Sequence, residues 1–169
     1  CYGIIRNHDG FINVESELAK GTTFSIYLPV SHKAVAAEEP RDTGKAISGN
    51  GTILLVDDER MILDVGKPML ERLGYNVHTA DSGKEAMVFF KEKHGVLDLV
   101  ILDMIMPDMG GGEVFDRMKE MDPGIRVLLS SGYSINGQAE EIMNRGCAGF
   151  MQKPFTLKQL SEKLHETLN

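Results

Sequence analysis

The sequence of 169 residues predicts a doubly wound α/β domain over residues 51–169, preceded by a short β-hairpin and a linker. Two observations support this fold class. From Gly51 onward, apolar runs typical of strands alternate five times with segments of helical periodicity. The first, third and fourth of these runs are apolar almost throughout, as expected where helices cover both faces of a parallel sheet.

The predicted strands and helices follow one another in strict alternation. The strands are expected at 52–56, 75–80, 97–102, 125–130 and 148–152. The helices are expected at 59–73, 82–93, 112–121, 135–145 and 156–168. The second and fifth helices begin with the spacing of a capping box, in which two side chains satisfy free backbone N–H groups of the first turn: Ser82 with Glu85, and Thr156 with Gln159.

The first thirty residues contain two strand-like stretches, Phe11–Ser16 and Thr22–Leu28, separated by a turn. Two strands alone are only marginally stable in water, so this segment is not expected to be a self-sufficient domain. Its open edges predict that it pairs with another chain, giving self-association, or packs on the following domain. Residues 31–50 have little periodicity and are rich in Ala, Glu, Gly and Ser, which is typical of a linker.

Composition excludes several classes of function. An apolar content of 42% is sufficient for a packed core. The net charge of −7 without a basic patch argues against a nucleic-acid partner. No apolar run approaches the roughly 20 residues of a membrane helix, and no signal peptide is visible. We therefore expect a cytoplasmic chain that does not insert into a membrane, and its start without Met suggests a piece of a longer protein.

Reactive polar side chains stand at the carboxyl ends of four of the five predicted strands. In chain order they are Asp57 and Asp58, Asp103, Ser130 and Ser131, and Lys153. Because the carboxyl ends of parallel strands meet at one edge of a sheet, and open α/β sheets bind ligands there, we expect these groups to converge.

Three carboxylates, Asp57, Asp58 and Asp103, repel one another unless a cation lies among them, and such hard oxygen ligands suit Mg²⁺ or Mn²⁺. An aspartate can also accept a phosphoryl group. Asp103 is the better candidate, because it stands alone before a loop containing Pro107 and three glycines. Lys153 would offset the charge that develops during transfer. The alternative interpretation is that Asp57 and Asp58 only cap the next helix.

Several neighbouring residues admit two interpretations. Either Ser130 or Ser131 can donate a hydrogen bond to a phosphoryl oxygen, since strand neighbours point to opposite faces. Phe150 is either a core residue or an aromatic side chain that changes rotamer on switching. Pro154 could form a cis peptide bond with Lys153. Asp108 is interpreted as a solvated turn residue.

Residues 51–169 resemble the response-regulator receiver family through an ordered set of motifs. These are the acidic pair after the first strand, DxxMPxxxG from Asp103, Ser131 with a small residue, and Lys-Pro at Lys153. The resemblance implies a flavodoxin-like sheet with strand order 2-1-3-4-5, and a domain that takes a phosphoryl group from phosphohistidine and then changes conformation.

The resemblance also implies roles for individual residues. Asp103 is the phosphoacceptor, with Lys153 as the active-site lysine. The switch residues are Ser131 and Phe150. The metal ligands for Mg²⁺ or Mn²⁺ are Asp57, Asp58, Asp103 and the backbone carbonyl of Ile105. The alternatives are a pseudo-receiver, which would be a phosphorylation-independent interaction module, and a phosphohydrolase, although the second acid of its DxDx[TV] motif is absent.

Residues 1–30 resemble the end of a histidine-kinase ATP-binding domain, through Gly3-Ile4-Ile5, His8-Asp9-Gly10 and Lys20–Phe24. The two resemblances imply a hybrid histidine kinase, with a kinase remnant at 1–30, a linker at 31–50 and a receiver at 51–169. A membrane anchor elsewhere in the parent kinase is compatible with this interpretation. The expected partner is a histidine kinase or a histidine phosphotransfer domain. The adenine-binding and magnesium-binding motifs of the kinase are absent, so no kinase activity is expected of this chain.

Overall fold

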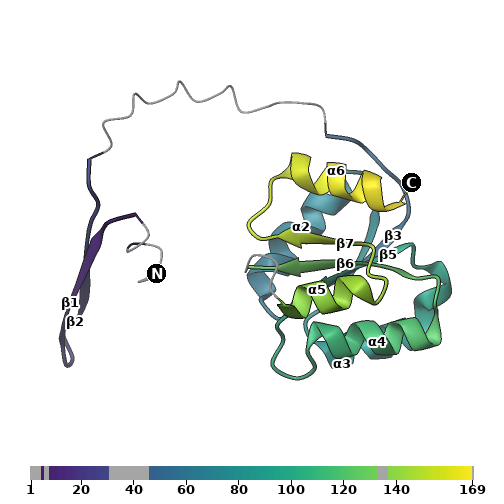
Figure 1. The fold of residues 1–169 in the computed structure, drawn as a ribbon, viewed down its shortest axis with the longest axis horizontal. Helices are drawn as coiled ribbons and strands as arrows, with labels where there is room; N and C mark the ends of the chain where they lie inside the picture. The colour runs from purple at the N-terminus through teal and green to yellow at the C-terminus, as the bar shows by residue number, and fades with distance from the viewer. Residues whose placement is uncertain (1–4, 6–7, 31–45, 133–136, 169) are drawn as a thin grey trace. The chain divides into compact units, whose positions relative to one another are not determined.

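The computed structural model describes residues 5, 8–30, 46–132 and 137–168, and the chain divides into two compact units, Cys1–Thr43 and Gly44–Asn169 (Figure 1). The first unit contains an antiparallel hairpin of β1 (Phe11–Glu17) and β2 (Gly21–Tyr27). Both strands lie within one residue of their predicted ends. Large apolar side chains on the hairpin are exposed: Phe11, Val14, Phe24, Ile26 and Tyr27.

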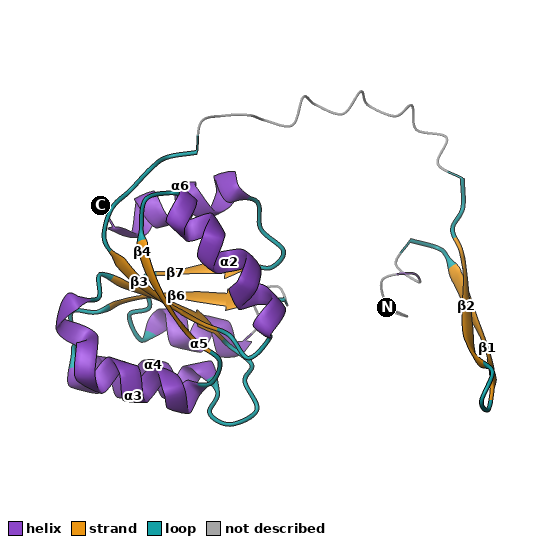
Figure 2. Ribbon diagram, turned by 180° about the vertical axis from the view of Figure 1, so that it is seen from behind, coloured by secondary structure: helices purple, strands orange, loops and turns teal. Residues whose placement is uncertain are grey.

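The second unit is built on a five-stranded parallel sheet (Figure 2). Its strands are β3 (Thr52–Val56), β4 (Asn76–Ala80), β5 (Leu99–Asp103), β6 (Arg126–Ser131) and β7 (Gly149–Gln152). The spatial order is β4-β3-β5-β6-β7, and every neighbouring pair is parallel. Counted from the first strand of this unit, the order is 2-1-3-4-5, so the predicted topology is confirmed.

The helices alternate with the strands as predicted. They are α2 (Arg60–Arg72), α3 (Gly83–Lys93), α4 (Gly111–Met121), α5 (Gly137–Asn144) and α6 (Leu157–Leu168). The first two residues predicted for α5 lie outside the described residues. Among the described residues, no helix has the length and apolar character needed to cross a bilayer.

The predicted start of the third strand at residue 97 is wrong. A short 3₁₀ helix, η1 (His94–Val96), precedes Leu97, and β5 begins only at Leu99. The Asp98 carboxylate accepts a hydrogen bond of 2.8 Å from the backbone N–H of Thr52, and the Asp98 N–H donates to the Thr52 carbonyl. The apolar pattern did not distinguish Leu97 and Asp98 from the strand that follows, because Leu97 is also buried.

Two apolar clusters fill the space on the two faces of the sheet. One lies under α3, α4 and α5 and includes Leu129 of β6, and the other lies under α2 and α6 and includes Leu128. Figure 1 shows the two groups of helices on opposite sides of the strands. Because side chains alternate along a strand, membership of a cluster tells which face each strand residue occupies.

Candidate functional site

Lys153 joins two buried carboxylates that come from different strands. Its Nζ lies 2.5 Å from Asp57 Oδ2 and 2.6 Å from Asp103 Oδ1. The side chains of Lys153, Asp57 and Asp103 are only 13%, 2% and 8% exposed. The three residues stand at the carboxyl ends of β7, β3 and β5, so the predicted convergence of these groups is confirmed.

The remaining carboxylate oxygens have backbone partners. Asp57 Oδ1 accepts a hydrogen bond of 3.1 Å from the N–H of Glu59, and Asp103 Oδ2 accepts one of 3.0 Å from the N–H of Ile105. Lys153 is held on its own side by its backbone N–H, which donates to the Ser131 carbonyl at 2.7 Å. The Lys153–Pro154 peptide bond is cis, as the sequence suggested. Both carboxylates are thus fixed in orientation before any ligand binds.

Burial and charge act in opposite directions on the ionisable groups of this site. Burial and, to a lesser extent, the charge of Asp57 raise the pKa of Asp103 above its usual value, against the hydrogen bond and charge of Lys153, which lower it. Burial alone would lower the pKa of Lys153, but the hydrogen bonds and negative charges of Asp103 and Asp57 together more than offset this and raise it. Lys153 is therefore a firmly charged cation between two acids.

Strand alternation places the site on one face of the sheet. Asp57, Asp103 and Lys153 each lie two residues beyond a member of the α2/α6 cluster: Leu55, Ile101 and Met151, respectively. Ser130, two residues beyond Leu128, belongs to the same face. Ser131, two residues beyond Leu129, belongs to the opposite face. Both serines are buried, at 2% and 4% exposed.

The structure only partly assembles the predicted metal ligands. Asp58 is exposed, and across the described ranges no three His, Cys, Asp or Glu side chains group closely enough to hold a metal ion. Asp57 and Asp103 nevertheless place two oxygens within hydrogen-bond distance of one cationic atom, the Lys153 nitrogen. Carboxylate oxygens that converge on one positive centre are the hard donors that Mg²⁺ prefers. The full set of metal ligands, which adds Asp58 and the Ile105 carbonyl, stays a prediction.

Asp108 has a structural role that sequence reasoning missed. It is exposed, but it is more than a solvated turn residue, because its two oxygens accept hydrogen bonds from the N–H groups of Gly83 (3.2 Å) and Lys84 (3.0 Å). These bonds, that from Lys84 above all, hold the pKa of Asp108 below its usual value. Asp108 therefore caps α3 and fastens the loop that follows Asp103. A turn pattern carries no sign of a partner 24 residues away.

One glycine of this loop is needed for close packing at the site. A Cβ at Gly111 would lie 2.4 Å from the backbone oxygen of Asp103. At Gly112 the nearest atom to an added Cβ would be Ile142 Cδ1 at 3.4 Å, which is ordinary contact. The start of α4 thus lies directly against the backbone of Asp103. This close approach requires a residue without a Cβ at position 111, which is glycine.

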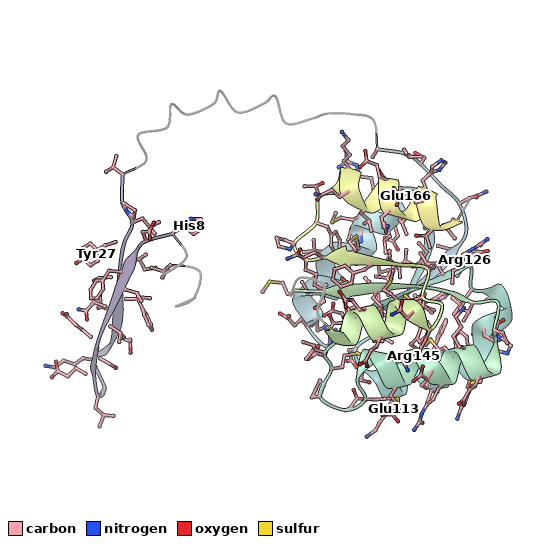
Figure 3. The ribbon with its side chains drawn as sticks, viewed as in Figure 1. His8, Tyr27, Glu113, Arg126, Arg145 and Glu166 are labelled. Atoms are coloured by element: carbon pink, nitrogen blue, oxygen red, sulfur yellow. The ribbon has the colours of Figure 1, made fainter. Side chains whose placement is uncertain are left out.

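The elements beyond Ser131 connect the site to the α4 and α5 side of the domain. Phe150 is half-buried against the α3/α4/α5 cluster. Arg145, labelled in Figure 3, lies immediately after α5. It forms an ion pair with Asp116 of α4, and its guanidinium carbon lies 5.9 Å from the centre of the Phe115 ring. These contacts hold the C-terminal end of α5 against α4.

Comparison with known proteins agrees with this geometry. The family model described as response regulator receiver domain matches residues 53–165. This match spans the whole sheet and reaches from β3 into α6. The chain therefore belongs to the response regulator receiver domain family.

Individual relatives share both sequence and fold. The sensor kinase CckA of Brucella abortus is 38% identical over 99% of this chain, which covers 18% of that protein. A receiver domain from Clostridium thermocellum has a TM-score of 0.67 and 33% identity, covering 70% of this chain and 94% of its own. The response regulator TrrA of Thermotoga maritima, solved in complex with Mg²⁺ and BeF, has a TM-score of 0.63 and 32% identity, covering 70% and 99%. The chain spans about a fifth of the curated sensor kinases it matches.

Proposed function

We propose that this receiver domain accepts a phosphoryl group on Asp103 from a phosphohistidine and changes conformation in response. The observation that carries the proposal is the contact of one buried lysine, Lys153, with two buried acids, Asp57 and Asp103. A carboxylate that attacks phosphorus needs a fixed orientation and neighbouring positive charge, and Asp103 has both.

The transfer step uses few groups of the protein. A carboxylate oxygen of Asp103 attacks the phosphorus, the P–N bond to the donor histidine breaks, and its electron pair returns to the imidazole. An acyl phosphate then replaces the carboxylate, and the negative charge at Asp103 rises. Lys153 is within reach to pair with a phosphoryl oxygen, because its ammonium already lies 2.6 Å from Asp103.

A divalent cation is the second part of the proposal. Asp57, Asp58, Asp103 and the Ile105 carbonyl would hold Mg²⁺ or Mn²⁺, which supplies positive charge next to the phosphoryl oxygens. The TrrA relative, solved with Mg²⁺ and BeF, supports this cofactor. Before the ion binds, the single positive charge of Lys153 offsets part of the negative charge of Asp57 and Asp103.

The conformational response is assigned to Ser131 and Phe150. Ser131 is the last residue of β6, so its hydroxyl, although on the other face of the sheet from Asp103, would turn across the end of the strand toward a phosphoryl oxygen. Phe150 would follow by repacking against the α3/α4/α5 cluster. The ion pair of Arg145 with Asp116 holds the end of α5 to α4, so a change in this region would alter the surface of α5.

The other candidate, a pseudo-receiver that never takes up phosphate, has less support. A module used only for binding has no need of a buried ammonium between two buried carboxylates, since such a cluster is costly to desolvate. The phosphohydrolase alternative lacks the second acid after Asp103, where Met104 and Ile105 stand.

The larger protein is proposed to be a hybrid histidine kinase. Residues 1–30 would be the end of its ATP-binding domain, residues 31–50 a linker and residues 51–169 the receiver. The match with the sensor kinase CckA over 99% of the chain supports this arrangement. The phosphoryl donor or acceptor would then be a histidine kinase or a histidine phosphotransfer domain in the cytoplasm.

The decisive experiment is phosphorylation of the chain by acetyl phosphate with Mg²⁺, followed by intact mass measurement. Wild type should gain the mass of one phosphoryl group, and Asp103→Asn should gain none. An equal gain in Asp103→Asn, or no gain in wild type, contradicts the proposal. Titration with Mg²⁺ by NMR separates the pseudo-receiver, which should show no saturable shifts around Asp57.

A further inference from the structure

Ser130 carries an unexplained polar group next to the site. Within the described part of the chain, its Oγ is the one buried side-chain nitrogen or oxygen without a hydrogen-bond partner. Ser130 is 2% exposed, so bulk water does not reach it. A buried hydroxyl left unpaired costs free energy, and such a group in a native protein often has a function.

The position of Ser130 is defined by its neighbours in the sheet. It pairs in register with Asp103 on β5 and with Met151 on β7. Residues paired across parallel strands project from the same face, so Ser130 lies on the face of Asp103. The α2/α6 cluster membership of Leu128, two residues earlier, agrees with this.

Lys153 has to cross the end of β6 to reach its partners. It starts after β7, and its ammonium contacts Asp103 on β5 and Asp57 after β3, while β6 lies between β7 and β5. Strand alternation places Lys153 and Ser130 on the same α2/α6 face, so the lysine side chain crosses the end of the strand that carries Ser130.

The chemistry of the two groups is complementary. A lysine ammonium has three N–H donors, and contacts with Asp57 and Asp103 account for two of them. A serine hydroxyl can accept as well as donate. A phosphoryl group on Asp103 would increase the negative charge on β5 and draw the ammonium from Asp57 toward β5, the strand next to Ser130.

We propose that Ser130 is a positioning residue for Lys153, whose ammonium donates a hydrogen bond to Ser130 Oγ when Asp103 carries a phosphoryl group. This inference rests on the proposed function. It assigns to Ser130 a role distinct from that of Ser131, which lies on the opposite face. In the resting domain the Ser130 hydroxyl is unpaired, because the Lys153 ammonium is then held between Asp57 and Asp103.

The test measures phosphorylation by acetyl phosphate with Mg²⁺ in the full chain, for Ser130→Ala, Ser130→Thr and a control, Ser161→Ala. Ser161 is also buried, but its hydroxyl donates to the Lys158 carbonyl within α6. Ser130→Ala should slow phosphorylation about two- to tenfold, the range that corresponds to one hydrogen bond of ordinary net strength. Ser130→Thr keeps the hydroxyl and should stay near the wild-type rate.

Thermal unfolding separates this role from a structural one. Ser130→Ala removes an unpaired group and should leave the melting temperature unchanged or higher, whereas Ser161→Ala should lower it without slowing phosphorylation. A double-mutant cycle with Lys153→Ala tests the route of the effect. If Ser130 acts through Lys153, Ser130→Ala should cause no further slowing in the Lys153→Ala background.

The possible failures are distinguishable. If wild type gains a phosphoryl group at Asp103 but Ser130→Ala reacts at the same rate, this inference is wrong and the proposed function stands. An undiminished effect of Ser130→Ala in the Lys153→Ala background also contradicts it, as does a slow but stable Ser130→Thr. If wild type gains no phosphoryl group, the proposed function fails first, and the role of Ser130 fails with it.

Discussion

The ammonium of Lys153 lies 2.6 Å from the carboxylate of Asp103, a residue 50 positions earlier in the chain. Asp57 completes the cluster on the other side at 2.5 Å. Because the three groups are almost fully buried, removal of the lysine leaves two negative charges without compensation in a region of low dielectric constant.

Replacing Lys153 should therefore destabilise the domain as well as impair phosphorylation. We expect Lys153→Met to lower the free energy of unfolding by about 3 kcal/mol, since two buried carboxylates lose their shared cation. Urea unfolding measures this loss. Lys67→Met is the matched control, because Lys67 is 46% exposed and 3.9 Å from Glu71, and it should change stability by less than about 0.5 kcal/mol. Equal effects of the two variants would contradict the role of Lys153.

Binding of Mg²⁺ should stabilise the domain in a manner that depends on Asp58. At ten times the dissociation constant, a ligand specific for the folded state adds about 1.4 kcal/mol. Asp58→Asn should reduce this increment strongly while leaving the stability without metal nearly unchanged, because Asp58 is exposed. Unfolding curves with and without Mg²⁺ give both values. The same increment in Asp58→Asn would exclude Asp58 from the metal ligands.

The contact of Gly111 with Asp103 predicts opposite results for two adjacent glycines. Gly111→Ala places a Cβ 2.4 Å from the Asp103 oxygen, so α4 must shift, at a cost of about 1–3 kcal/mol. Phosphorylation should slow as well, since the shift moves the backbone of the phosphoacceptor. Gly112→Ala meets only ordinary contacts and should be neutral or slightly stabilising, because alanine favours helix. Chemical unfolding and the rate with acetyl phosphate test both variants.

Asp108 predicts a loss of stability at acidic pH. Its pKa is lowered in the folded state, so its contribution is present above the unfolded pKa, near 4, and is lost as pH falls through the lower folded pKa. Asp108→Ala should lower the free energy of unfolding by about 1 kcal/mol at pH 7, as for the loss of a helix cap, and by less at pH 3. Unfolding of both proteins at several pH values measures the difference. A difference that stays constant with pH would rule out the charged cap.

The hairpin predicts self-association of the chain. Val14 and Phe24 are paired across its strands, and both are more than half exposed, at 55% and 64%. Sedimentation of the full chain should show association that increases with concentration, and Val14→Ser combined with Phe24→Ser should reduce it. Wild type that remains monomeric at all concentrations would contradict this prediction.

Much of the architecture follows from local patterns in the chain. The apolar run before Asp57 predicted β3 at its observed bounds, and Ser82 accepts the hydrogen bond from the Glu85 N–H that its capping box predicted. The positions of Asp57, Asp103 and Lys153 directly after strands were enough to predict that they converge, because parallel strands present their carboxyl ends at one edge.

The tertiary structure alone decided which groups meet. It gave Lys153 two partners, placed Ser130 on the face of the site and Ser131 on the other, joined Asp108 to α3 and set Gly111 against Asp103. Periodicity and capping are properties of neighbouring residues, and they therefore determine strands, helices and their ends. Contacts between residues 8 to 96 positions apart depend on how the strands register and how helices pack over them, which no short pattern records.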